Sequence, residues 1–446
     1  MAHITVPTTN ATGGDSGHVE AEAITLGLRD ARPATLALHA DETLRLVDDI
    51  APPIHVSTTY KYPNDPQQLM PFYGRDIGPT EFVYSRESSG NPTRLEAVLS
   101  SLLKSPCLTY SSGLAAIHAA YILLSPRRIS IGNGYHGTHG VLEIHKRVSG
   151  CKELPLDCLA EDLSAGDLIC LETPVNPTGN AFNISHYAEK AHSRGAYLMV
   201  DSTFAPPPLQ DPFAWGADIV MHSGTKYIGG HSDMLCGVLA TKNKNWFTQL
   251  AEDRVFLGSV MGSLEGWLGV RSARTLELRV QRQSQNAMDL VEALDGALSG
   301  LSVGTGLSQS DVDVVKEVVA EVKHASLQHG DKSWLTKQMP VGYGPVFAMV
   351  MKNGDLAKRL PSKLHFFAHA TSLGGVESLV EWRTMSDATV ERTLLRFSIG
   401  IEDSRDLLED LMSGFRALLE QDNQLQSVTT KLEDTCNTAA DPAESV

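Results

Sequence analysis

The chain has 446 residues, of which 42% are hydrophobic and 20% are charged, a composition typical of globular proteins. Because domains commonly hold about 100–200 residues, this length predicts two or more domains. The formal net charge of −16 argues against non-specific binding to nucleic acid or to an anionic membrane.

Several further protein classes are not favoured by the sequence. No apolar run approaches the roughly 18 residues that a membrane-spanning helix requires. Residues 1–18 have neither the basic leader nor the apolar core of a secretory signal. The six cysteines form no CxxC pair and no Cys/His cluster at zinc spacing, so we expect reduced thiols, no metal site and a cytoplasmic location.

Residues 1–60 form the expected N-terminal arm, and its first 20 residues, rich in Gly, Thr and Ser, are predicted to be disordered. From about residue 93 to residue 260, helix-like and strand-like segments alternate. Apolar spacing predicts helices over 93–104 and 184–195, and runs rich in β-formers predict strands over 127–132, 167–173, 196–203 and 217–223. This alternation predicts βαβ units around a parallel sheet, and we assign residues 61–290 to a large α/β domain.

The last part of the chain follows a different pattern. A continuous helical pattern over residues 263–294 is suited to linking two lobes. Strand-like segments over 345–352 and 394–401, with a helix-like segment over 404–421, predict a smaller α/β domain over residues 291–421. The acidic residues 422–446 are predicted to form a disordered tail.

An acid and a lysine follow consecutive predicted strands. Asp201 ends one apolar run, and Lys226 follows the next within Ser223-Gly224-Thr225-Lys226. Ligands of parallel sheets bind at the carboxyl ends of the strands, so we expect both side chains at one site. Pyridoxal 5′-phosphate (PLP) requires these groups: an amine for its aldehyde, a carboxylate for its pyridine nitrogen and hydroxyls for its phosphate.

A turn from Ser111 to Leu114 precedes an apolar helical segment and predicts backbone N–H groups that face a phosphate. Each signal alone has an ordinary explanation, since an Asp at a strand end is often part of a turn and a serine before a helix is often only a cap. Their occurrence in one chain, in an order that one parallel sheet can assemble, favours PLP.

From about residue 50 to residue 419 the sequence resembles the Cys/Met-metabolism family of PLP enzymes, which includes cystathionine γ-synthase, cystathionine lyases, methionine γ-lyase and O-acetylhomoserine sulfhydrylase. The matching segments occur in the family's order: APPIHVSTTY, YSRESSGNPTRLEAVLSSL, YSSGLAAI, GYHGTHGV, LETPVNPTG, DSTFAPP, HSGTKYIGGHSD, SLGGVESLV and LLRFSIGIED. The resemblance implies a PLP-dependent transferase of fold type I, with PLP in the large, mostly parallel domain. It also implies a homotetramer of two dimers that share their active sites.

The resemblance assigns roles to individual residues. Lys226 resembles the lysine that forms a Schiff base with PLP, Asp201 the partner of the pyridine nitrogen, and Tyr135 the aromatic ring stacked on the cofactor. Arg396 resembles the clamp on the substrate carboxylate, a task suited to a guanidinium. Further cofactor contacts are expected from Ser112, Gly113, Leu114, Asn176, Ser223 and Thr225, further substrate contacts from Asn176 and Ser372, and phosphate contacts in a neighbouring subunit from Tyr84 and Arg86.

The sequence also departs from the family pattern. The segment between Arg86 and the Asn-Pro-Thr at 91–93 is longer than usual, and Thr371 stands where several cystathionine enzymes carry Glu. Residues 381–383, Glu-Trp-Arg, replace a common His-Pro and resemble fungal cystathionine γ-synthase-like proteins, including biosynthetic ones of secondary metabolism. We therefore expect γ-replacement on O-acetyl-L-homoserine, or a similar O-activated homoserine, by a thiol or a carbon nucleophile. The alternatives are a β- or γ-lyase that releases ammonia and a keto acid, and a non-catalytic protein that keeps the fold.

Overall fold

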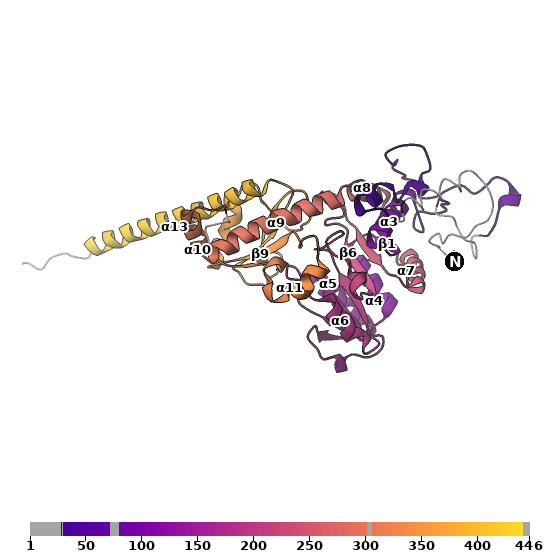
Figure 1. The fold of residues 1–446 in the computed structure, drawn as a ribbon, viewed down its shortest axis with the longest axis horizontal. Coiled ribbons are helices and arrows are strands. Elements are labelled where there is room, and N and C mark those ends of the chain that lie inside the picture. Colours follow the sequence, from indigo (N-terminus) through magenta and orange to yellow (C-terminus); the bar gives the residue numbers. More distant parts are fainter. Residues whose placement is uncertain (1–27, 29, 72–79, 301–305, 440–446) are drawn as a thin grey trace, which may run out of the picture.

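The computed structural model describes residues 28, 30–71, 80–300 and 306–439, with residues 425–439 as backbone only. The predicted disorder of residues 1–20 falls outside these ranges. Two lobes are joined by the long helix α9 (Leu276–Leu298), which runs from one into the other (Figure 1). Within the described ranges, no helix has both the length and the hydropathy that crossing a membrane requires.

The large domain contains a seven-stranded sheet with the order β1-β7-β6-β5-β4-β2-β3. Strand β7 is antiparallel to both of its neighbours, and the other pairs are parallel. The four strands expected from apolar runs are β2 (Arg128–Ile131), β4 (Leu168–Glu172), β5 (Tyr197–Asp201) and β6 (Ile219–Ser223). The remaining strands are β1 (Cys107–Tyr110), β3 (Lys152–Pro155) and β7 (Gly237–Ala240). The predicted mostly parallel sheet is thus confirmed.

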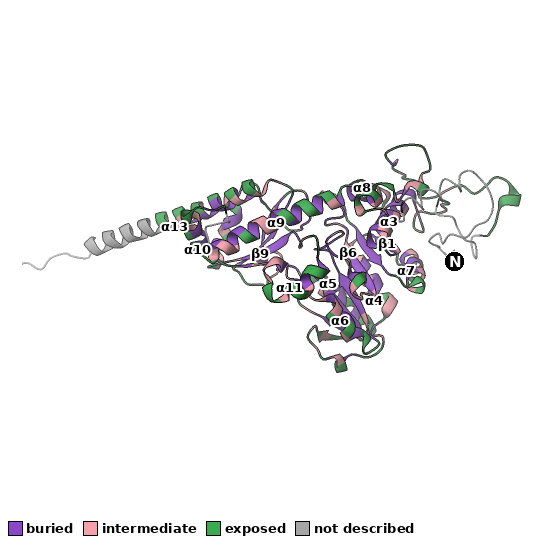
Figure 2. Ribbon diagram, viewed as in Figure 1, coloured by how far each residue is buried: buried purple, intermediate pink, exposed green. Residues whose placement is uncertain are grey.

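Alternate residues of the central strands enter two different cores. In β5, Met199 packs in a cluster with α4 (Gly113–Leu124), α5 (His136–Ser149) and α7 (Lys244–Leu257). Leu198 and Val200 pack in a second cluster with α6 (Ile184–His192). Successive strand residues point to opposite faces, so burial on both faces requires the continuous apolar run that the sequence shows. Figure 2 shows the sheet as buried and the outer helix surfaces as exposed.

The described part of the N-terminal arm packs on the large domain. Helix α2 (Pro33–His39) leads to Asp41, whose buried carboxylate lies 2.6 Å from a guanidinium nitrogen of Arg94 on α3 (Gly90–Leu103). On α8 (Ser263–Ala273), Trp267 Nε1 donates a hydrogen bond to the Pro52 carbonyl at 2.7 Å. These long-range contacts fix where the arm lies.

The helical pattern over residues 263–294 is two helices, α8 and α9, rather than one. Thr275 leaves the helical conformation, with φ −116° and ψ 10°. Its hydroxyl donates to the Ser272 carbonyl and accepts from Arg279 Nε, at 3.3 Å and 3.1 Å. A threonine hydroxyl that bonds the backbone of the preceding turn competes with helix continuation, which explains the break.

The smaller domain is built on a five-stranded sheet with the order β10-β11-β12-β9-β8. Its strands are β8 (Val319–Lys323), β9 (Val346–Met351), β10 (Ala368–His369), β11 (Leu379–Trp382) and β12 (Leu394–Ser398). Its helices are α10 (Gln309–Val318), α12 (Gly354–Arg359) and α13 (Ser404–Ala439). Helix α11 (Lys332–Gln338) lies in this part of the sequence but packs Leu335 in a core cluster of the large domain. Only the β10–β11 pair is parallel within this sheet.

The expectation of a disordered tail from residue 422 was wrong, because α13 continues as a helix to Ala439. At the start of that segment, the Asp422 carboxylate lies 2.6 Å from Arg359 on α12. Acidic composition favoured disorder, but a tertiary ion pair with a basic residue 63 positions earlier supports the helix there. Residues 440–446 lie outside the described residues.

Candidate active site

The predicted acid and lysine lie on neighbouring strands of the large sheet, as the sequence indicated. Asp201 is the last residue of β5, and Lys226 follows the end of the adjacent strand β6. On the other side of β5, Glu172 ends β4 and is the direct register partner of Asp201. Glu172 and Asp201 therefore lie side by side at the carboxyl edge of the sheet, and Lys226 follows the neighbouring strand at the same edge.

The Lys226 amine contacts the smaller domain. Its backbone is held in a tight turn, in which Lys226 N donates to the Ser223 carbonyl and Gly230 N donates to the Lys226 carbonyl. Its Nζ donates to Ser372 Oγ at 2.9 Å. Burial, with the positive charge of Arg396 adding to it, lowers the pKa of the Lys226 amine to about 8, so about a tenth of the amine is unprotonated at pH 7.

The Ser372 segment approaches the lysine backbone closely. Both Ser372 and Gly374 have positive φ, at 75° and 83°. A Cβ added at Gly374 would lie 2.9 Å from the carbonyl carbon of Lys226 and from Tyr227 N. Only glycine leaves room for this contact, which holds the loop against the lysine.

Asp201 is buried and oriented by Thr203. Asp201 Oδ1 accepts from Thr203 N at 3.0 Å and from Thr203 Oγ1 at 2.5 Å. The Thr203 hydroxyl in turn accepts from Ser223 N at 2.8 Å. Among the described residues, both hydrogen bonds to the Asp201 carboxylate go to one oxygen, so Oδ2 keeps its accepting capacity for a ligand. Burial raises the pKa of this carboxyl, and a cationic partner would hold it ionised.

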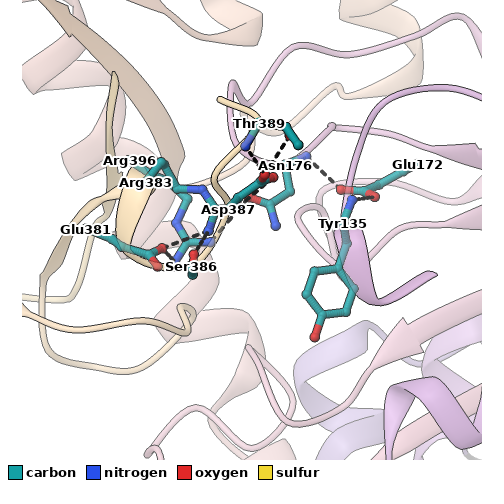
Figure 3. A network of polar contacts seen from close by, with 9 residues as sticks. All are labelled: Tyr135, Glu172, Asn176, Glu381, Arg383, Ser386, Asp387, Thr389 and Arg396. Carbon is teal, nitrogen blue, oxygen red and sulfur yellow. Dashed lines mark hydrogen bonds and ion pairs between the residues drawn. The ribbon is translucent and has the colours of Figure 1, made fainter. Parts of the chain in front are cut away.

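Glu172 connects two predicted site residues that sequence reasoning left unconnected. Its carboxylate accepts from Tyr135 N at 2.8 Å and from Asn176 N at 2.6 Å (Figure 3). Burial and the adjacent Asp201 raise the pKa of Glu172. We missed this residue, although it ends a predicted strand just as Asp201 does, and that position was the available signal.

The predicted carboxylate clamp lies in a buried polar cluster. Arg396 donates to Asn176 Oδ1 at 3.2 Å and to the Ser372 carbonyl at 2.6 Å. Its guanidinium also lies 2.7 Å from Glu381, whose carboxylate lies 2.9 Å from Arg383 (Figure 3). The structure thus brings Asn176, Ser372 and Arg396 together, and it adds Glu381 and Arg383, for which the sequence offered no role.

The predicted phosphate turn forms the start of helix α4. Ser112 caps this helix, its Oγ accepting from Ala115 N at 3.1 Å, with Gly113 and Leu114 in the first turn. A Cβ added at Gly113 would lie 3.2 Å from Ser223 Oγ, so the turn and the Ser223 hydroxyl are adjacent. Backbone N–H groups at a helix start, with hydroxyls beside them, form an anion-binding arrangement.

The Thr225 hydroxyl is engaged differently from our expectation. It accepts from Cys236 N at 2.9 Å and is within 3.3 Å of the Cys236 carbonyl. It therefore joins the turn that carries Lys226 to the strand region before β7, rather than pointing a free donor at the site.

Tyr84 and Arg86 lie together but apart from the rest of the predicted site. The Arg86 guanidinium sits 4.9 Å from the centre of the Tyr84 ring, and both residues are exposed. Among the described residues, neither forms a hydrogen bond or ion pair with Lys226, Asp201 or the α4 turn. Within one chain, these two residues do not complete the site.

A cavity opens at the carboxyl edge of the sheet. Tyr135, Glu172 and Asp201 line it, together with Asn133, His139 and Phe182. The cavity therefore reaches the acid that ends β5 and the aromatic residue that immediately precedes α5.

Comparisons with known proteins identify relatives of the chain. The family model described as Cys/Met metabolism PLP-dependent enzyme matches residues 34–416. The chain is 32% identical over 411 residues to cystathionine γ-lyase of Saccharomyces cerevisiae, covering 86% of this chain and 97% of the relative. It is 30% identical over 394 residues to cystathionine γ-synthase of Escherichia coli, covering 82% and 93%.

Solved structures share the fold. The crystal structure of MetB from Corynebacterium glutamicum matches with a TM-score of 0.76 and 29% identity, covering 87% of this chain and 99% of that one. The predicted fold of PLP-dependent enzymes, a large mostly parallel domain with a smaller α/β domain, is therefore confirmed.

The residues at the sheet edge fit PLP. The half-buried Lys226 offers an amine of lowered pKa, and Asp201 offers an oriented carboxylate with a free oxygen. The start of α4 and the Ser223 hydroxyl offer donors for a phosphate. Amine, carboxylate and anion cradle are the three groups that this cofactor requires of a protein.

Proposed function

The chain belongs to the Cys/Met metabolism family of PLP-dependent enzymes, and from this premise we propose that it catalyses γ-replacement on an O-activated homoserine. The favoured substrate is O-acetyl-L-homoserine, and the nucleophile is a thiol or a carbon acid. One observation supports this most: Ser372 contacts both the Lys226 amine and the Arg396 guanidinium. A base and a carboxylate anchor therefore contact the same residue and lie close together, as chemistry at the carbons of an amino acid requires.

Lys226 and Asp201 are assigned the central roles. PLP supplies an electron sink for the carbanion formed at the substrate α-carbon. Lys226 removes the α-proton and moves protons to and from the β-carbon, a role suited to an amine whose pKa is about 8. Asp201, held by Thr203, keeps the pyridine nitrogen protonated.

The substrate carboxylate is assigned to Arg396, with Asn176 and Ser372 beside it. Tyr135 is assigned to the face of the cofactor ring, and Glu172 fixes its backbone. In the net reaction the bond between the γ-carbon and the ester oxygen breaks, acetate leaves with the electron pair, and the nucleophile adds at the γ-carbon while losing its proton.

The assignment of Tyr84 and Arg86 requires a second subunit. Both are exposed, and within the described part of one chain neither bonds to the α4 turn. We therefore propose that they bind the cofactor phosphate of a neighbouring chain. Large exposed apolar side chains in the same region, namely Ile50, Val56, Tyr62 and Met70, support an interface there. The assembly we propose is a homotetramer of two active-site-sharing dimers.

A lyase reaction is the second candidate, because the named relatives include both a lyase and a synthase. Mass spectrometry of products from O-acetylhomoserine, incubated with a panel of thiols and β-keto acids, separates the two. Replacement predicts a new amino acid that contains the nucleophile. Ammonia and a keto acid in equal amounts, with no incorporation of any nucleophile, would favour the lyase and refute our proposal. The departures at Thr371 and at residues 381–383 lead us to place the reaction in specialised biosynthesis.

A further inference from the structure

Two buried guanidiniums share one buried carboxylate beside the proposed substrate pocket. Glu381 Oε2 lies 2.7 Å from Arg396 and 2.9 Å from Arg383. All three side chains are almost fully buried, with 3% to 4% of each exposed. One carboxylate oxygen therefore bridges two cations (Figure 3).

The acids of this cluster are unevenly shared between the two guanidiniums. Arg383 has a second acidic neighbour, Asp387, but at 3.8 Å, and that carboxylate is also bonded to Thr389. Among the described residues, Arg396 has neutral partners apart from the shared Glu381. A buried charge requires a partner, so a further carboxylate is better accommodated at Arg396 than at Arg383.

The remaining partners of the two guanidiniums show which one can take this anion. Among the described residues, the Nε atoms of Arg396 and Arg383 are both buried without a hydrogen-bond partner, so this feature does not separate them. Arg383 is tied on its other side by a 2.8 Å bond to Ser386 Oγ and faces Asp387. Arg396 faces the neutral Asn176 amide and the Ser372 carbonyl instead, so it is the guanidinium without an acid of its own.

We propose that Arg383 is a positioning residue: it shares the Glu381 carboxylate with Arg396, so that Glu381 does not neutralise Arg396 alone and Arg396 keeps attraction for a substrate carboxylate. This inference rests on the proposed function, which assigns the substrate carboxylate to Arg396. Without Arg383, Glu381 pairs with Arg396 alone and competes with the ligand. Arg383 thus sets the affinity for a carboxylate without touching it.

Two amines that carry no leaving group at the γ-carbon test the proposal on the PLP-loaded enzyme. L-norleucine carries the α-carboxylate, and n-pentylamine is the same molecule without it. Binding of both is measured by calorimetry for Arg383→Gln, for the double variant Glu381→Gln/Arg383→Gln and for the control Arg392→Gln, an exposed arginine nearby. Steady-state KM and kcat for O-acetylhomoserine are measured alongside.

Arg383→Gln is predicted to weaken norleucine binding about tenfold, the scale of one charge-assisted contact, and pentylamine binding less than about twofold. KM should rise with little change in kcat. Removing the competing carboxylate in the double variant should restore norleucine affinity to within about threefold. Arg392→Gln should change neither probe.

Three results would overturn the proposal. They are unchanged norleucine affinity in Arg383→Gln, equal weakening of both probes, and a double variant as impaired as the single one. The last would mean that Arg383 contacts the ligand itself. If Arg383→Gln does not fold, Arg383→Lys and the double variant are measured in its place. The proposal predicts that both bind norleucine nearly as well as the unchanged enzyme does. A tenfold loss of norleucine affinity in either variant, with pentylamine affinity unchanged, contradicts the proposal.

Failure of the proposed function gives a different signature. Arg396→Gln should lower norleucine affinity strongly and leave pentylamine affinity nearly unchanged. If it affects neither probe, the carboxylate clamp is assigned wrongly, whatever Arg383 does.

Discussion

The amine of Lys226 donates a hydrogen bond to the hydroxyl of Ser372, a residue 146 positions later in the chain. The lysine follows strand β6 of the large sheet, and the serine lies between strands β10 and β11 of the smaller domain. Since Ser372 also accepts from Arg396, this contact joins the proposed base to the proposed substrate clamp. The proposed reaction therefore depends on both domains.

Replacing Lys226 with alanine is predicted to lower turnover at least about 100-fold, because a positioned acid–base group contributes on this scale. The fold should remain, since removal of a buried amine leaves no charge without a partner. Turnover and thermal unfolding check this, with Lys337→Ala, an exposed lysine of α11, as the control. Full activity of the Lys226 variant would refute the assigned role.

Cofactor uptake should report the lowered pKa of Lys226. The reactive form is the free amine, so with a pKa of about 8 the rate of PLP uptake by the apoenzyme should rise roughly tenfold from pH 7 to pH 9 and then level off. The rate is followed by absorbance. Arg396→Gln removes a neighbouring positive charge and should move the midpoint to higher pH. A rate that keeps rising past pH 10, as for an ordinary lysine, would contradict the account.

Gly374→Ala is predicted to destabilise the protein by about 1–3 kcal/mol and to lower turnover. The added Cβ would meet the Lys226–Tyr227 backbone at 2.9 Å, and the positive φ of 83° disfavours a side chain. Gly140→Ala is a matched control, because this glycine lies within α5 and has no heavy atom within 4 Å of an added Cβ. Thermal unfolding of both variants measures the difference, and equal stabilities would show that the Gly374 contact is not tight.

Glu172→Gln should weaken PLP binding by about tenfold, because one carboxylate now accepts from two backbone N–H groups and an amide has only one accepting oxygen. The loosened backbone is that of Tyr135 and Asn176. The dissociation constant of PLP checks this, with Glu292→Gln on the exposed face of α9 as the control. Equal affinities in the two variants would remove Glu172 from the account.

The elements that were predictable are those with a local signal. Strands β4 and β5 carry apolar runs that must be buried on both faces, and Asp201 could be placed because it ends such a run. The break at Thr275 depends on one hydroxyl and on Arg279, whose guanidinium reaches the Tyr227 carbonyl 52 positions away. Such a contact leaves no periodicity in the sequence.

The polar cluster was beyond local reasoning for the same reason. Asn176 and Arg396 are 220 positions apart, and their contact exists only when the two domains are packed. In the sequence, Glu381 and Arg383 are only a departure from the family pattern. Their role becomes visible in the structure, where both are buried beside Arg396 and share its ion pair. The sequence assigned the Thr225 hydroxyl to the phosphate, but in the structure this hydroxyl accepts a hydrogen bond from Cys236 N.

The central claim is that PLP is held covalently by Lys226, and reduction of the PLP-loaded enzyme with borohydride followed by peptide mass mapping tests it most directly. We predict the reduced pyridoxyl group on the peptide that contains Lys226, at close to one group per chain. A label on a different lysine, or no label on a protein that retains bound PLP and activity, would contradict the account.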